Sequence, residues 1–273
     1  MAAATPTSKI PRPGETLVQP GPTFSWGPSK TLRRTRYTVR VPFDLPPGGL
    51  SAWHLSDLHY QTRPIPALVD LAKEIERGDG PDLVLHTGDF VDNKKNAGPG
   101  WATAAPVLER LIGRLGTFGI QGNHDRVLPP ERLGEVGITF VNHRQTVDVG
   151  GAAVELLSLP GKSRQTVDFD APEFHADVST DRLSIRLTHF PDWTLQCRHP
   201  ATITLAGHTH GGQICLPGGL PVITNDRLGR WRAKGLRDVG GTWLIVSRGI
   251  GTTRIPFRAW CPPELVELQF ESL

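Results

Sequence analysis

The sequence predicts an α/β fold: a four-layer α/β/β/α sandwich in which two mixed β-sheets pack face to face and helices flank them. Three observations support this prediction. Apolar strands alternate with helical segments in the first half of the chain, strands dominate the second half, and nearly every strand ends in a short polar cluster. With 273 residues, the chain is long enough to bury a sizeable core without disulfide bonds.

The first half of the chain shows the alternation of strands and helices. The segment 36–41 (RYTVRV) alternates polar and apolar residues, as a half-buried strand does. The segment 65–78 repeats its apolar residues at helical spacing and ends on Gly78, a common helix stop. By the same patterns we expect further strands at 50–57, 81–89 and 117–125, and a second helix at 101–116 with Gly116 as its C-cap.

The second half of the chain is rich in strands. The segment 144–160 predicts a hairpin that turns at Gly150 and Gly151. Apolar runs predict four more strands, at 182–190, 201–210, 241–249 and 264–270. No internal repeat or boundary is visible after residue 36, so we expect residues 36–273 to form one domain.

Residues 1–35 are expected to form a separate arm that is basic and rich in proline and glycine. Residues 1–40 hold seven lysines and arginines against Glu15 alone, whereas the net charge of the whole chain is only +3. Such an arm can touch an anionic membrane surface or nucleic acid, or it can be a solvated tail. Because the tryptophans are scattered and form no stacking platform, we expect no specific nucleic-acid partner.

Cysteine use and hydropathy indicate the compartment. Cys197, Cys215 and Cys261 are far apart, and they match neither a disulfide framework nor a zinc knuckle. The chain has no apolar run near 18 residues, and its start lacks the apolar core of a secretory signal. We therefore expect a cytoplasmic protein. Peripheral contact of the basic arm with the inner face of the membrane stays open as an alternative to a solvated tail. The sequence does not indicate an oligomeric state.

The polar clusters at the strand ends contain seven residues that can bind metal. In open α/β sheets the carboxyl ends of strands face one crevice, so residues that follow neighbouring strands can converge there. The candidates are four histidines, two aspartates and one asparagine: Asp57, His59, Asp89, Asn123, His189, His208 and His210. The glycines beside them allow a close approach of the backbone to a ligand.

Seven donors are too many for one ordinary divalent ion. Two four-coordinate sites need eight contacts, so one donor has to bridge, and a carboxylate with its two oxygens does this best. Imidazole and carboxylate ligands without thiolate suit Mn, Fe or Zn, of which we favour Mn. Two such ions can clamp the attacking and leaving oxygens of an in-line phosphoryl displacement, with a hydroxide held between them as the nucleophile.

The order of the motifs resembles the calcineurin-like metallophosphoesterase superfamily. Its series of five blocks is present here in order: Asp57-x-His59, Gly88-Asp89, Gly122-Asn123-His124-Asp125, His189 and Gly207-His208-x-His210. The resemblance spans roughly residues 37–270. The extension GHTHGGQI and the C-terminal tail resemble bacterial phosphodiesterases of the YkuE and YaeI type and the chlamydial kind of UDP-diacylglucosamine pyrophosphatase.

This resemblance implies a role for each residue of the blocks. One metal would be held by Asp57, His59, Asp89 and His210, and the other by Asp89, Asn123, His189 and His208, with Asp89 as the bridge. His124 would face the phosphate, stabilise charge and protonate the leaving oxygen, and Asp125 would orient His124. Some lipid-nucleotide hydrolases of the superfamily carry arginine where this chain has His124, which weakens the direct transfer of their substrate.

The resulting hypothesis is a metal-dependent phosphoric ester hydrolase that cleaves a phosphodiester or a pyrophosphate, with a lipid-linked nucleotide as one candidate substrate. Three residues near the motifs are candidate substrate contacts: Arg126, Gln213 and Arg254. Two alternatives stay open. The first is a metal-dependent nuclease, against which the charge of −3 on residues 41–273 argues. The second is a non-catalytic scaffold on the same fold, against which the filled ligand positions argue.

Overall fold

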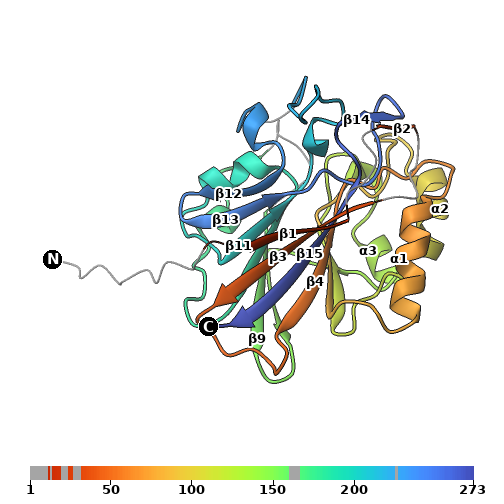
Figure 1. Cartoon of the computed structure of the whole chain (residues 1–273). Coiled ribbons are helices and arrows are strands. Elements are labelled where there is room, and N and C mark those ends of the chain that lie inside the picture. The colour runs from red at the N-terminus through yellow and green to blue at the C-terminus, as the bar shows by residue number, and fades with distance from the viewer. Residues whose placement is uncertain (1–11, 13, 20–23, 27–31, 160–166, 225–226) are drawn as a thin grey trace.

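The computed structural model describes residue 12 and residues 14–19, 24–26, 32–159, 167–224 and 227–273. Two large sheets form the centre of this part of the chain (Figure 1). The seven-stranded sheet has the order β1-β3-β15-β4-β5-β6-β7. Its strands are β1 (Gly14–Gln19), β3 (Arg33–Val41), β15 (Glu264–Ser272), β4 (Leu50–Leu55), β5 (Leu83–His86), β6 (Gly116–Gly119) and β7 (Thr139–Phe140).

The second sheet has six strands in the order β12-β13-β11-β10-β9-β8. They are β12 (Gly235–Val239), β13 (Thr242–Val246), β11 (Ile203–Ala206), β10 (Ser184–Thr188), β9 (Ala153–Ser158) and β8 (Arg144–Asp148). The β8–β9 hairpin turns at Gly150 and Gly151, both with positive φ, as the sequence predicts. A short antiparallel pair joins β14 (Phe257–Ala259) to β2 (Phe24–Trp26).

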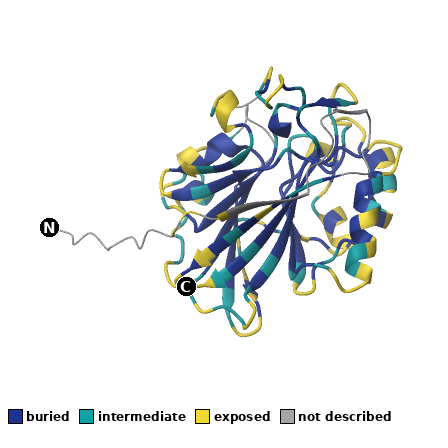
Figure 2. Cartoon of the chain, viewed as in Figure 1, coloured by how far each residue is buried: buried dark blue, intermediate teal, exposed yellow. Residues whose placement is uncertain are grey.

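Apolar side chains from both sheets fill the space between them. Val39, Leu85 and Phe118 of the first sheet share one buried cluster with Leu156 and Leu187 of the second. The alternation predicted for β3 is visible here, since Tyr37, Val39 and Val41 are buried on this inner face. Figure 2 shows the buried residues concentrated along the strands. The interface between the sheets is therefore one continuous core.

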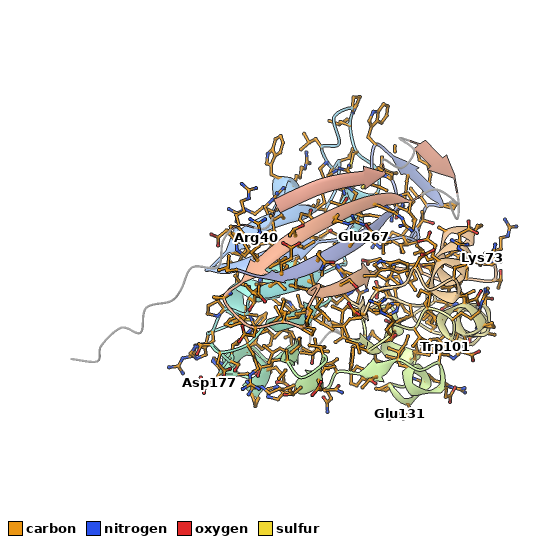
Figure 3. All side chains as sticks on the ribbon, turned by 60° about the horizontal axis from the view of Figure 1, so that its bottom comes forward. Arg40, Lys73, Trp101, Glu131, Asp177 and Glu267 are labelled. Carbon is orange, nitrogen blue, oxygen red and sulfur yellow. The ribbon has the colours of Figure 1, made fainter. Side chains whose placement is uncertain are left out.

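Helices cover the outer face of the first sheet: α1 (Pro66–Glu76), α2 (Gly98–Leu108) and α3 (Glu131–Glu135). Apolar residues of α1 and α2 share a second buried cluster with residues of β4 and β5. Lys73, Trp101 and Glu131, one from each of these helices, lie on the same side of the sheet in Figure 3. Shorter elements accompany the second sheet, namely α4 (Pro172–His175) and the 3-10 turn η2 (Pro191–Gln196), with Phe174 and Trp193 packed together. The α/β sandwich with flanking helices is as expected.

Several element boundaries differ from the sequence prediction, and the end of the second helix differs most. The helix predicted for 101–116 ends at Leu108, and Gly116 begins β6 instead of capping the helix. Tertiary hydrogen bonds explain the difference, because Arg114 N and Leu115 N donate to the carbonyls of Pro81 and Asp82. The helix ends early because these amides form hydrogen bonds with the segment before β5 and not with the preceding helical turn.

The N-terminal segment takes part in the sheet where the structure describes it. Strand β1 pairs antiparallel with β3, and this pairing includes Glu15 and Tyr37 as partners. Lys9 and Lys30 of the basic arm lie outside the described residues. The division into an arm of residues 1–35 and a domain of residues 36–273 therefore stays a proposal. None of the described helices is long and apolar enough to cross a membrane.

Strand direction determines where the polar clusters meet. Strands β4, β5, β6 and β7 run parallel, as do β9, β10, β11 and β13. The carboxyl ends of these parallel strands therefore share an edge within each sheet. Contacts between the loops of the two sheets join the two edges, since His208 N donates to Asp57 Oδ1 and His189 Nδ1 donates to Thr87 O.

Candidate metal centre

The seven predicted ligand residues all lie at this shared edge. Asp57 and His59 follow β4, and Asp89 follows β5. Backbone hydrogen bonds hold these two loops together, from Asp57 N to Gly88 O (3.0 Å) and from His59 N to Asp89 O (2.9 Å). The remaining four follow β6, β10 and β11: Asn123, His189, His208 and His210.

Five of these residues have the left-handed backbone conformation, which residues other than glycine rarely adopt. Their φ values lie between 45° and 69°: Asp57, His59, Asp89, His208 and His210. Such conformations cost about 1–3 kcal/mol each, and they persist only where surrounding contacts enforce them. The unusual backbone was expected at the neighbouring glycines, but the ligand candidates themselves adopt it.

The glycine before His208 has a different function. A Cβ at Gly207 would lie 1.9 Å from Ser56 Oγ and 2.4 Å from Asp57 Oδ2. Gly122, before Asn123, has the same relationship to Asp89, whose Oδ1 would lie 2.3 Å from a Cβ there. These glycines are required because the loops of different strands touch at the carboxylates.

The first group of donor atoms surrounds His59 and His210. Their Nε2 atoms are 3.0 Å apart. Asp57 Oδ1 lies 3.4 Å from His210 Nε2, and Asp89 Oδ2 lies 3.3 Å from His59 Nε2. All four residues are buried. Their arrangement agrees with the first of the two ligand sets that the resemblance implied.

The second group surrounds His189. Its Nε2 lies 3.0 Å from Asn123 Oδ1 and 3.3 Å from both His208 Nδ1 and Asp89 Oδ2. Asp89 Oδ2 is thus equally close to a histidine of each group. That is the position a bridging carboxylate requires.

The chemistry of the second group fits a cation. His189 Nδ1 faces the carbonyl oxygen of Thr87 at 2.8 Å, which places the ring proton on Nδ1 and the lone pair on Nε2. That lone pair points at Asn123 Oδ1 and Asp89 Oδ2, which are themselves acceptors. Converging acceptors repel one another unless positive charge lies among them, which can be a proton on His189 Nε2 or a metal ion in its place. The set of donor atoms therefore fits a divalent metal ion.

The carboxylates also change the pKa of the histidines. Burial lowers the pKa of His59, but hydrogen bonds to Asp89 and Asp92 outweigh burial and raise it to about 10. For His189, burial is likewise outweighed by the charge of Asp89, and the pKa rises to about 9. The same two histidines hold the pKa of Asp89 well below its usual range despite burial. The site therefore attracts positive charge.

His124 lies beside the first group. Its Nδ1 is 2.5 Å from the carbonyl oxygen of Asp92, and its ring meets that of His59 edge-on at 4.5 Å between centroids. Burial, together with the neighbouring His59 and Lys94, lowers the pKa of His124 to about 4. The imidazole is therefore neutral near pH 7, with its proton on Nδ1.

The role assigned to Asp125 has to be corrected. Its carboxylate does not orient His124; that contact belongs to the Asp92 carbonyl. Asp125 Oδ2 accepts the backbone N–H groups of Asp89 (2.7 Å) and Gly122 (2.9 Å), and Oδ1 accepts that of Val91 (3.2 Å). Asp125 thus holds the loop that presents Asp89.

Asp92 is not among the residues predicted from the sequence. Its Oδ1 lies 3.1 Å from His59 Nδ1, and its carbonyl oxygen binds His124. One residue therefore fixes the rings of two predicted site residues. Its position three residues after Asp89 was a signal, since a carboxylate near a histidine ligand commonly sets the tautomer of that ligand.

Arg258 was also missed, because it lies on β14, far from the motifs in sequence. It is fully buried, and its guanidinium donates to the carbonyl oxygens of Gly251, Arg248 (2.9 Å) and Cys261 (3.2 Å). Its Nη2 is 3.5 Å from His210 Nδ1. A buried arginine thus ties the His210 loop to the C-terminal segment.

A cavity of about 540 Å³ opens beside the donor groups. Exposed Arg126 and Arg254 line it, as do Lys94 and His124. Gln213 lines it as well, but its amide already bonds the backbone of Thr253 and Ile255. Gln213 therefore supports the loop that carries Arg254, and its contact with the substrate stays a prediction.

Comparison with known proteins gives the family. The family model for the calcineurin-like phosphoesterases matches residues 50–212. This range contains all seven donor residues, and with the two-sheet fold it defines a metal-dependent phosphoric ester hydrolase. The chain belongs to the calcineurin-like phosphoesterase family, in the bacterial branch of YkuE and YaeI.

The relatives support this branch. The metallophosphoesterase YkuE of Bacillus subtilis is 34% identical over 203 residues, which cover 70% of this chain and 68% of YkuE. The phosphodiesterase YaeI of Escherichia coli is 32% identical over 228 residues, covering 79% of this chain and 80% of YaeI. Among solved structures, the NAD nucleotidase of Haemophilus influenzae matches with a TM-score of 0.48 and 14% identity, over 74% of this chain and 45% of its own.

Proposed function

We propose that this protein hydrolyses a phosphodiester or pyrophosphate bond with two divalent metal ions, Mn²⁺ being favoured. One observation carries the proposal: a single carboxylate oxygen, Asp89 Oδ2, lies 3.3 Å from a histidine of each donor group. A carboxylate so placed suits two ions that share a ligand. When bound, the ions would activate a water molecule and neutralise the charge of the phosphate.

The first ion would be held by Asp57, His59 and His210, and the second by Asn123, His189 and His208, with Asp89 shared. Mixed imidazole, amide and carboxylate ligands suit Mn, Fe or Zn better than Mg or Ca. The contacts within each group of donor atoms support this division.

The chain's own residues would orient the substrate. Arg126 and Arg254 line the cavity, and a guanidinium can bind two phosphate oxygens at once. His124 Nδ1 is occupied by the Asp92 carbonyl, so Nε2 is left to bind the phosphate or the leaving oxygen. Burial lowers the pKa of His124, so Nε2 is a hydrogen-bond acceptor near pH 7. A bound phosphate would raise this pKa, and the imidazolium would then stabilise charge and donate a proton to the leaving oxygen.

The cavity favours a substrate larger than phosphate itself. Its volume of about 540 Å³ leaves room for groups on both sides of the phosphorus. Apolar residues form one wall, among them Ile214, Val222 and Ile255. This combination of cations and an apolar wall supports a lipid-linked nucleotide as one candidate substrate.

Hydrolysis assays test the proposal. Purified protein with Mn²⁺ should cleave a chromogenic phosphodiester such as bis(p-nitrophenyl) phosphate, and faster than the matching monoester. Asp89→Ala serves as the negative control. A folded protein that binds metal but cleaves neither diesters nor pyrophosphates with Mn²⁺, Fe²⁺ or Zn²⁺ would refute the proposal.

A further inference from the structure

Large apolar side chains are exposed around the mouth of the cavity. Ten such side chains are exposed in the described part of the chain, and three of them line the cavity: Val222, Ile223 and Ile255. Two more, Leu216 and Trp231, lie on segments that are hydrogen-bonded to residues of the cavity lining. We call these five the mouth surface: Leu216, Val222, Ile223, Trp231 and Ile255. Ile223 is 69% exposed and Trp231 is 77% exposed. Exposure on this scale beside a polar site indicates a binding surface.

The fold holds the mouth surface in place beside the donor groups. Ile214 accepts a hydrogen bond from Val222 N, so residues 214–222 form a small hairpin that contacts Gly212 through Pro221. The carbonyl of Ala233, two residues after Trp231, accepts a hydrogen bond from Thr209, between the two histidines of the last motif. In Figure 1 the light-blue segments between β11 and β12 lie at the top, with β14.

The same segments are basic. Residues 207–237 hold five lysines and arginines against Asp226 alone. Residues 248–258 hold three arginines and no acidic residue, and of these Arg254 is exposed, whereas Arg258 is buried and Arg248 pairs with Glu264. Arg230 and Arg232 flank Trp231 and are exposed, and Arg254 precedes Ile255. Protruding apolar residues interleaved with arginine are typical of a surface that lies in the headgroup region of an anionic bilayer.

The basic residues near the N-terminus are less suited to this contact. Arg34 pairs with Glu74 and Glu267, and Arg36 pairs with Glu267 on strand β15. Arg40 and Glu267, which lie along β3 and β15, are labelled in Figure 3, and Arg40 pairs with Glu271. Three glutamates, Glu74 of α1 and Glu267 and Glu271 of β15, therefore already pair with three of the arginines on which the expected membrane contact depended.

From this surface we infer that the protein docks on an anionic lipid bilayer through the mouth surface, with Ile223, Trp231 and Ile255 in the headgroup region. Arginines around the mouth bind lipid phosphates, and the cavity opens toward the membrane. The substrate class follows from this orientation and rests on the proposed function: a phosphate ester in the headgroup of a membrane lipid.

Vesicle sedimentation of the full-length, metal-loaded protein tests the docking. The protein should sediment with vesicles of equal parts phosphatidylcholine and phosphatidylglycerol, less with phosphatidylcholine alone, and less again as salt is raised. Ile223→Ser combined with Trp231→Ser should weaken the binding by about tenfold or more, from lost apolar burial alone. The matched control is Leu115→Ser with Leu273→Ser, since both leucines are exposed outside the mouth surface, and it should bind as the unaltered protein does.

Two results would overturn the inference: no binding to anionic vesicles, or equal binding by the double variant and the unaltered protein. Hydrolysis of a soluble diester separates this inference from the proposed function. If the protein cleaves the diester but does not bind vesicles, the proposed function stands and the docking inference is refuted. If the protein binds vesicles through the mouth surface but cleaves no ester, the docking inference stands and the proposed function is refuted.

Discussion

Asp89 Oδ2 lies 3.3 Å from Nε2 of His189. The same oxygen is 3.3 Å from His59, which belongs to the other donor group. If this carboxylate bridges two ions, Asp89→Ala should remove both and lower the rate of diester hydrolysis by at least about 10³-fold, since metal charge stabilisation contributes several kcal/mol. Metal analysis by mass spectrometry checks this. Retention of both ions by the folded variant would contradict the bridge.

The two histidines of the last motif should act on different ions. His208 contacts His189, and His210 contacts His59 and Asp57. His208→Ala should therefore lose preferentially the ion of Asn123 and His189, and His210→Ala the other. Metal content per chain and the spectrum of Co²⁺-substituted protein distinguish the two variants, with exposed His175→Ala as the control. Equal loss of both ions from either variant would mean that the division is wrong.

Asp92 should control metal affinity without binding metal itself. Asp92→Asn weakens the acceptor that faces His59 Nδ1, and loss of such a partner typically costs about 10–100-fold in metal affinity or activity. Titration of the metal-free protein with Mn²⁺ measures the change. Asp79→Asn, at an exposed ion pair with Arg77, should leave affinity unchanged. An unaltered affinity in Asp92→Asn would show that His59 needs no such partner.

Asp125 should contribute to stability through the backbone it binds. Asp125→Ala leaves three backbone N–H groups without their acceptor, which should cost at least about 3 kcal/mol in the free energy of unfolding. Chemical denaturation of the metal-free protein measures this separately from metal binding. Asp70→Ala, on the exposed face of α1, should change stability by less than about 0.5 kcal/mol. If Asp125→Ala lowered activity but not stability, a direct catalytic role would be supported instead.

Gly207 should tolerate no side chain. Gly207→Ala pushes a methyl group into Ser56 Oγ and Asp57 Oδ2, so we expect a loss of about 1–3 kcal/mol in stability and weaker binding of the ion near Asp57. Gly134→Ala is the control, because its Cβ meets nothing within 4 Å and alanine favours the helix by about 0.5–1 kcal/mol. Thermal unfolding with and without metal compares the two variants. Equal unfolding temperatures of the two variants, with and without metal, would show that the Asp57 loop can move to accommodate the methyl group.

The sequence by itself determined which donor residues exist and the strands they follow. Hydrophobic periodicity locates β4, β5, β10 and β11, and side chains that follow neighbouring parallel strands have to meet at one edge. The resemblance to the calcineurin-like family implied that His208 belongs with His189 and His210 with His59, and in the structure each of these two pairs is in contact. These features depend on local pattern and on a general property of parallel sheets.

Only the tertiary structure decided which side chains support the donors. Asp125 binds the backbone of another loop, Gln213 holds the Arg254 loop, and Arg258 reaches His210 across 48 positions of sequence. Hydrogen bonds between distant loops also ended the helix at Leu108 and hold ligand candidates such as Asp89 in the left-handed conformation. Such contacts have no periodicity, because their partners meet only after the sheets have packed.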